Sequence, residues 1–241
     1  MSFESATQSP KLNTQNSNFM EFSNSSASPA APTSRLRVAQ GLVLLFHLTG
    51  FVGLAFAQDK TFYLKYTPLT LLLTAGLLGA FQPERNWAFW LFVGQVFLIG
   101  FMAEFVGVNT GAIFGSYTYG ATLGPKYVEV PWLIGLNWVI VTYCAGILTS
   151  YLPLPAVLRV LVGAALMVGF DLCLEPVASR YDFWHWTGNI IPLRNFRDWF
   201  LLSLVMQLLF LRSSFPKRNP LVPLVYLVQL LFFFVLGLLT T

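Results

Sequence analysis

The sequence predicts an all-α fold, a polytopic transmembrane helix bundle of about seven spans. Of its 241 residues, 56% are hydrophobic and only 10% are charged. A soluble domain carries about a quarter charged residues, so this chain has too few to cover a surface that faces water. Apolar runs recur from residue 35 onward, each close to the roughly 20 residues that a membrane helix needs. They are about twice as long as barrel strands and do not alternate, which favours helices.

The first 34 residues differ from the rest of the chain. They are rich in Ser, Asn, Thr, Ala and Pro and poor in large apolar residues. Such a segment buries too little surface to offset its chain entropy, so residues 1–34 are expected to form a disordered polar tail. They lack the charged start, apolar run and cleavage site of a secretory signal peptide. The transmembrane domain is therefore expected to occupy residues 35–241.

The apolar runs give the expected spans in order. Two are weak: the second contains Pro68, and the sixth is short. The expected spans are residues 37–57, 63–82, 87–106, 131–150, 155–175, 197–212 and 220–240.

Two long loops, near residues 107–130 and 176–196, follow the third and fifth spans. Loops separated by two spans lie on the same membrane face, so we expect these two to meet. With the N-terminus inside, eight of the 14 basic residues lie on the inner side, which weakly favours a cytoplasmic N-terminus. The expected location is a cell membrane crossed several times, such as a bacterial inner membrane.

Three acidic residues lie in apolar runs, where a carboxylate costs upwards of about 2.5 kcal/mol and needs a partner. Glu104 is near the end of the third span, and Asp171 and Glu175 are near the end of the fifth. The last two are four residues apart and share one helix face. Two like charges so close favour keeping one carboxyl group protonated, which makes it a usable proton donor. The structural alternative is that these acids bind loop amides or pair with Arg194 and Arg197.

The two loops carry glycine and aromatic side chains. In the first, four glycines in fourteen residues let the backbone turn tightly or approach a ligand, and Tyr117 and Tyr119 lie among them. In the second, Trp184 and Trp186 flank His185. These aromatics could form an interfacial belt, or they could stabilise a cation with their ring faces. Both interpretations remain open on the sequence alone.

Several other classes of site find no support. The net charge of +4 is spread over loops, which argues against a nucleic-acid partner. The two cysteines lie in apolar stretches and are expected to be small core residues. No metal-ligand spacing occurs, and two histidines are too few for a histidine-rich site. His47, alone in the first span, is expected to be a hydrogen-bonded packing residue.

The residues around the two loops resemble a known family. The segments FGSYTYGATLGPK, VPWLIGLNW and DLCLEPVASRYDFWHWTGNIIPLRNFRDWF are similar to the bacterial and archaeal carotenoid-biosynthesis membrane proteins. That family includes hydratases of the bisanhydrobacterioruberin and gamma-carotene type. The chain departs from the family's Gly-Val-Pro pattern, with Glu129 and Ile190 at the positions of that glycine.

The resemblance implies hydration of the terminal double bond of an acyclic carotenoid end, without a redox or metal cofactor. The substrate would enter from the lipid phase, with membrane lipid and other carotenoid-pathway enzymes as further partners. Asp171 would be the acid, Glu175 its partner or the base, and Glu104 would complete the cluster. The side chains expected to line the substrate pocket or orient water are Tyr117, Tyr119, Trp184, Trp186, Asn109 and Asn195. Two rival functions remain: a proton-coupled transporter and a non-catalytic carotenoid-binding protein.

Overall fold

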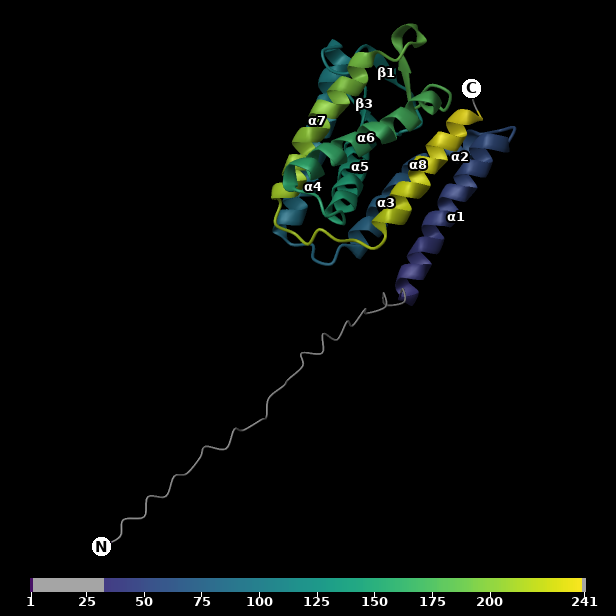
Figure 1. The fold of residues 1–241 in the computed structure, drawn as a ribbon. Coiled ribbons are helices and arrows are strands. Elements are labelled where there is room, and N and C mark those ends of the chain that lie inside the picture. The colour runs from purple at the N-terminus through teal and green to yellow at the C-terminus, as the bar shows by residue number, and fades with distance from the viewer. Residues whose placement is uncertain (2–32, 240–241) are drawn as a thin grey trace. The chain divides into compact units, whose positions relative to one another are not determined.

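The computed structural model describes Met1 and residues 33–239 (Figure 1). The chain divides into residues 1–32 and a compact unit of residues 33–241, which holds every helix and strand given below. The disordered tail expected for residues 1–34 therefore lies almost wholly outside the described residues.

Among the described residues, each expected apolar run contains a helix. The helices are α1 (Ser34–Phe56), α2 (Thr61–Lys65), α3 (Thr67–Phe81), α4 (Trp87–Thr110), α5 (Trp132–Ser150), α6 (Ala156–Ala178), α7 (Leu193–Arg212) and α8 (Val222–Leu238). The second run is divided into α2 and α3 just before Pro68, because proline lacks an N–H and is tolerated in the first turn of a helix. The all-α membrane helix bundle is confirmed.

The helices differ in how readily they can cross a membrane. Among the described residues, four are long and apolar enough: α1, α4, α5 and α6. The apolar helices α3 and α8 are shorter, at 15 and 17 residues. The number of seven spans therefore stays a prediction.

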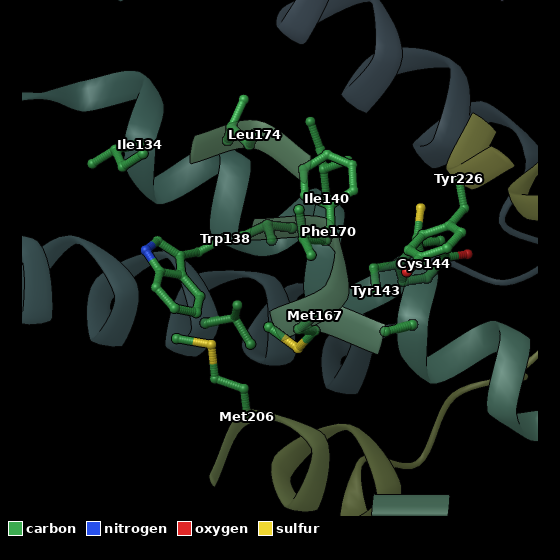
Figure 2. Close-up of a cluster of buried hydrophobic side chains, with 14 of the residues drawn as sticks. Ile134, Trp138, Ile140, Tyr143, Cys144, Met167, Phe170, Leu174, Met206 and Tyr226 are labelled. Atoms are coloured by element: carbon green, nitrogen blue, oxygen red, sulfur yellow. The ribbon is translucent and has the colours of Figure 1, made fainter. Parts of the chain in front are cut away.

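Helix α5 forms the centre of the packing. It contacts α3, α4, α6, α7 and α8, while α8 also packs on α1 and α6 (Figure 1). Thirteen of its 19 residues are buried. Around it, Trp138, Ile140 and Cys144 of α5 meet Met167 and Phe170 of α6 in one apolar cluster (Figure 2). This core holds the ends of α4, α6 and α7 at fixed positions.

The two long loops meet, as expected, and they do so through strands that the sequence analysis did not anticipate. Strand β1 (Tyr117–Tyr119) pairs antiparallel with β4 (Trp184–Trp186), with Thr118 opposite His185. A second short pair joins β2 (Lys126–Tyr127) to β3 (Val130–Pro131). Alternate side chains of a strand point to opposite faces, so the two tyrosines and two tryptophans all point to the buried face of the β1–β4 ribbon.

Candidate functional site

The three carboxyl groups of the apolar helices α4 and α6 lie beneath the β1–β4 ribbon. Glu104 lies in the last two turns of α4, and Asp171 and Glu175 lie in the last two turns of α6. All three are buried, with 3%, 0% and 4% of their surfaces exposed. Helix ends place the carboxyl groups at the level of the loops, and the ribbon covers them.

Glu104 receives three hydrogen bonds from side chains. Tyr117 and Tyr119 donate their hydroxyls to Oε2 at 2.5 and 2.7 Å, and the Trp138 indole donates to Oε1 at 3.0 Å. Burial, reinforced by the negative charge of Glu104, raises the pKa of both tyrosines well above their usual range. The phenols therefore keep their protons and act as donors, and Glu104 is a pure acceptor in this arrangement.

Glu175 and Asp171 are joined by one amide. Asn195 of α7 donates from Nδ2 to Asp171 Oδ2 at 2.9 Å and to Glu175 Oε1 at 3.0 Å. The other oxygen of Glu175 accepts from the indoles of Trp186, at 2.7 Å, and Trp184, at 3.3 Å. The amide has two hydrogens, so it can serve both carboxyl groups at once. Helix α7 and the second loop thus fix the positions of Asp171 and Glu175 relative to each other.

Asp171 differs from the other two acids in one respect. Its Oδ1 is fully buried and has no hydrogen-bond partner among the described residues. An acidic proton placed on this oxygen would break no existing hydrogen bond, whereas every oxygen of Glu104 and Glu175 already accepts one or two. Asp171 is therefore the carboxyl group best suited to store a proton.

A small cavity lies between these groups. Its volume is about 20 Å³, which suits about one water molecule. Glu104 and Glu175 face it, but Asp171 does not and lies behind Asn195 and Glu175. The lining residues are Glu104, Phe114, Tyr117, Tyr119, Ile134, Asn137, Glu175, Trp184, Trp186, Asn195 and Trp199.

Aromatic rings make up most of the wall. The Trp138 and Trp199 rings are stacked with centroids 3.8 Å apart, and Tyr117 lies 5.0 Å from Trp186. Ring faces attract positive charge, by upwards of about 2 kcal/mol when the site is closed to water. Aromatic faces beside carboxyl groups are therefore suited to stabilise a carbocation, once the walls move apart to admit one, since the cavity now has room for about one water molecule.

The two arginines that could have paired with the three acids form their ion pairs with another residue. Arg194 and Arg197 pair with Asp198, at 3.4 and 2.8 Å. Asp198 also accepts from the backbone N–H of Phe114, whose φ is +64°, so it fixes a strained turn of the first loop. The three carboxyl groups do tie the loops to the helices, but through tyrosine, tryptophan and asparagine side chains.

The structure brings together eight of the nine residues that the sequence analysis selected. The exception is Asn109, whose exposed side chain bonds the carbonyls of Phe105 and Val128 and does not line the cavity. We therefore drop Asn109 from the site. His47 is a packing residue as expected, with Nδ1 donating to the Val43 carbonyl at 2.8 Å.

Five lining or contact residues were missed: Phe114, Ile134, Asn137, Trp138 and Trp199. An aromatic side chain in an apolar helix is typical of packing, so Trp138 gave no separate signal. The spacing of Asn195 and Trp199, one helical turn apart, could have indicated that both face the acids. Asn137 could have been selected as a polar residue inside an apolar span.

Two further features lie outside this cluster. A larger cavity of about 370 Å³ lies between α3, α4 and α5, but its wall is apolar apart from Arg85 and Tyr143. It offers no acid or base, so we assign the chemistry to the smaller cavity. Among the described residues, no group of three His, Cys, Asp or Glu side chains is arranged to hold a metal ion.

Comparison with known proteins places the chain in a family. The family model for carotenoid biosynthesis proteins matches residues 66–241, which includes all the site residues. Bisanhydrobacterioruberin hydratase of Haloarcula japonica is 31% identical over 121 residues, which cover 47% of this chain and 41% of that protein. The match thus spans less than half of the relative's length. No solved structure matches the chain.

Proposed function

The chain belongs to the carotenoid biosynthesis protein family, and from that premise we propose that it is a hydratase. It would add water to the terminal double bond of an acyclic carotenoid end and give a tertiary alcohol. The observation that carries this proposal is the small, mostly aromatic cavity that Glu175 faces, with Asp171 joined to Glu175 by Asn195 behind it. The similarity to a protein named as a hydratase supports the same assignment.

The reaction needs an acid, a cation-stabilising wall and a base. A proton adds to the less substituted alkene carbon, and the π electrons form the new C–H bond. The other carbon becomes a tertiary cation, and a water oxygen donates an electron pair to it. The water then loses a proton to a carboxylate, so the enzyme recovers the proton that it gave. No redox change occurs in these steps.

The geometry suggests a division of labour among the acids. Glu175, which faces the cavity, exchanges protons with the substrate and the water, and Asp171 holds the reserve proton on Oδ1. The Asn195 amide donates to both acids and carries no proton, so the proton passes directly to Glu175 when the Asp171 carboxyl group turns. Both oxygens of Glu104 already accept hydrogen bonds, and they fix Tyr117, Tyr119 and Trp138 in place. Asn195 keeps the two acids together.

The setting follows from the substrate. A carotenoid dissolves in the lipid phase, and a membrane helix bundle can admit it sideways between helices. We propose a multi-pass protein of the cell membrane with a cytoplasmic N-terminus, which works beside other enzymes of carotenoid synthesis. No cofactor is needed for proton-initiated hydration.

Expression in cells that make lycopene or gamma-carotene tests the function. Pigments that gain the mass of one water per modified end are the expected result. The Asp171→Asn variant should lose this product by about 10²-fold or more, the usual contribution of a general acid. Asp59→Asn is the matched control, because Asp59 is exposed in the loop between α1 and α2. Unchanged pigment masses with the wild-type chain, in cells where it inserts in the membrane, would refute the proposal.

A further inference from the structure

A second cavity, of about 80 Å³, lies beside the one that holds the acids. It is formed by α1, α3, α6 and α8, with Gly50 and Phe232 among its walls. The two cavities share one lining residue, Asn137 of α5, whose half-buried side chain separates them. A ligand in the second cavity would therefore have one end next to the acids.

The wall of this cavity is made mainly of aromatic and aliphatic side chains, with a few polar groups. Phe170 and Phe183 come from the acid side, and Phe232 packs edge-on against His47 with ring centroids 6.1 Å apart. Thr67 and Thr70 also line the cavity, but their hydroxyls donate to backbone carbonyls of the preceding turn. The other polar side chains in the wall are Tyr63, Asn137, His47 and Gln229. Of these, His47 and Gln229 come from the adjoining helices α1 and α8, and Gln229 lies one turn before Phe232, the ring that packs on His47.

These two side chains offer opposite hydrogen-bonding groups. His47 Nδ1 faces a carbonyl, so it must carry the hydrogen, and Nε2 of the neutral ring is then an acceptor. Gln229 is 8% exposed, and its amide has no hydrogen-bond partner among the described residues, so its NH₂ is a donor without a partner. Buried polar groups without partners are unfavourable by about 1–3 kcal/mol each. A purely hydrocarbon ligand would leave both in that state.

A hydroxyl group satisfies both, because it can donate to His47 Nε2 and accept from the Gln229 amide. We propose that the second cavity binds a segment of isoprenoid chain that carries a hydroxyl group, held by His47 and Gln229. The identification of the chain as isoprenoid depends on the proposed function, whereas the preference for a hydroxyl depends only on these two side chains. The ligand would enter between α1 and α8 and extend past Asn137 towards the acids.

Binding measurements on the full chain in lipid nanodiscs test this site. The probes are a C20 isoprenoid alcohol and the C20 hydrocarbon that lacks only its hydroxyl. The wild-type protein should bind the alcohol about 3- to 10-fold more tightly, the effect of one net hydrogen bond. In the His47→Leu and Gln229→Leu variants, the affinity for the alcohol should fall close to the affinity for the hydrocarbon. Equal affinity for the two probes in the wild-type protein, or a preference that survives both substitutions, would overturn the proposal.

A pair of glycine variants locates the site. A side chain at Gly50 would extend from α1 towards Phe232, so Gly50→Phe should fill the cavity and weaken binding of both probes by about 10-fold or more. Gly50→Leu is the milder version if the phenylalanine prevents insertion. Gly41→Phe is the control, because Gly41 is exposed on the same helix with open space beside it. Full binding in both Gly50 variants would also overturn the proposal.

The same measurements separate this inference from the catalytic one. Asp171→Asn removes the proposed acid, which does not line the second cavity, so the preference for the alcohol should remain. If hydration fails in cells while the binding pattern holds, the binding site stands and the catalytic assignment falls.

Discussion

At the residue scale, the hydrogen bonds divide three similar acids into two roles. Glu104 accepts from three neutral donors and has no oxygen to spare. Asp171 has one buried oxygen without a partner, and its other oxygen accepts from the Asn195 amide, which also donates to the cavity-facing Glu175. Identical chemical groups therefore differ in what they can do because different side chains surround them.

Glu104→Gln tests the role of Glu104 as an acceptor. The glutamine amide has one acceptor oxygen, so its NH₂ would face at least one of the donors Tyr117, Tyr119 and Trp138. We expect a loss of about 1–3 kcal/mol of stability, seen as a lower midpoint of thermal unfolding in detergent. Glu84→Gln, at an exposed position, is the matched control. If the two variants unfold at the same temperature, Glu104 does not hold the wall in place.

The sequence indicated these acids because a carboxyl group in an apolar span needs a reason to be there. It could not separate Asp171 from Glu104, because their difference depends on donors that come from the loops and from other helices. Trp138 and Trp199 were missed for a related reason: in helices rich in aromatics, a tryptophan that contacts the site cannot be told from one that only packs.

At the element scale, close helix contacts position the site. Gly100 of α4 lies against Trp138 of α5, the residue that bonds Glu104 and stacks on Trp199. A Cβ atom at Gly100 would lie 2.5 Å from Trp138 Cγ, so the glycine is needed for this approach. Helix α4 thus determines the position of Glu104 and also the position of the Trp138 ring, which donates a hydrogen bond to Glu104.

Gly100→Ala should therefore displace Trp138 and cost about 1–3 kcal/mol, the usual effect of overpacking. The yield of hydrated product should also fall, because the displaced Trp138 ring shifts the wall of the cavity. Gly94→Ala on the same helix has open space around its Cβ and should leave stability and activity unchanged. Both are measured as unfolding midpoint in detergent and product yield in carotenoid-making cells. Equal behaviour of the two variants would show that the contact is not needed.

Hydropathy predicted the helices but not the strands between them. Strands β1 and β4 have three residues each, too few to show an alternating pattern, and they are fixed by pairing with each other. The break between α2 and α3 was foreshadowed by Pro68, whose effect on a helix is local. Pairing across 67 residues of chain depends on tertiary structure and leaves no local signal.

At the scale of the whole molecule, we predict that the chain crosses the membrane seven times. Within residues 33–239, four helices have the length and composition of a span, and α3, α7 and α8 are shorter or less apolar. The β1–β4 ribbon brings the two long loops together, as the expected seven spans require. Chain length and hydropathy predict how many helices form. Whether each helix crosses the bilayer is measured on the protein in a membrane.

Cysteine labelling supplies that measurement. Single cysteines at Ser116 and Ser179, both exposed, should react with a membrane-impermeant reagent from the same side of the membrane. A cysteine at Ser213, between α7 and α8, should be reached only from the other side if α7 crosses. The native Cys173 is partly exposed and is first replaced by serine. Labelling of Ser116 and Ser179 from opposite sides would exclude the seven-span topology.

The most direct test of the account is the origin of the atoms in the product. Purified protein in nanodiscs, given an acyclic carotenoid in ¹⁸O-labelled D₂O under argon, should form a tertiary alcohol with one ¹⁸O at the hydroxyl and one deuterium on the adjacent carbon. Asp171→Asn should form it at least about 10²-fold more slowly. A product whose oxygen comes from O₂, or full activity in the neutral variants of Asp171, Glu175 and Glu104, would contradict hydration by these acids.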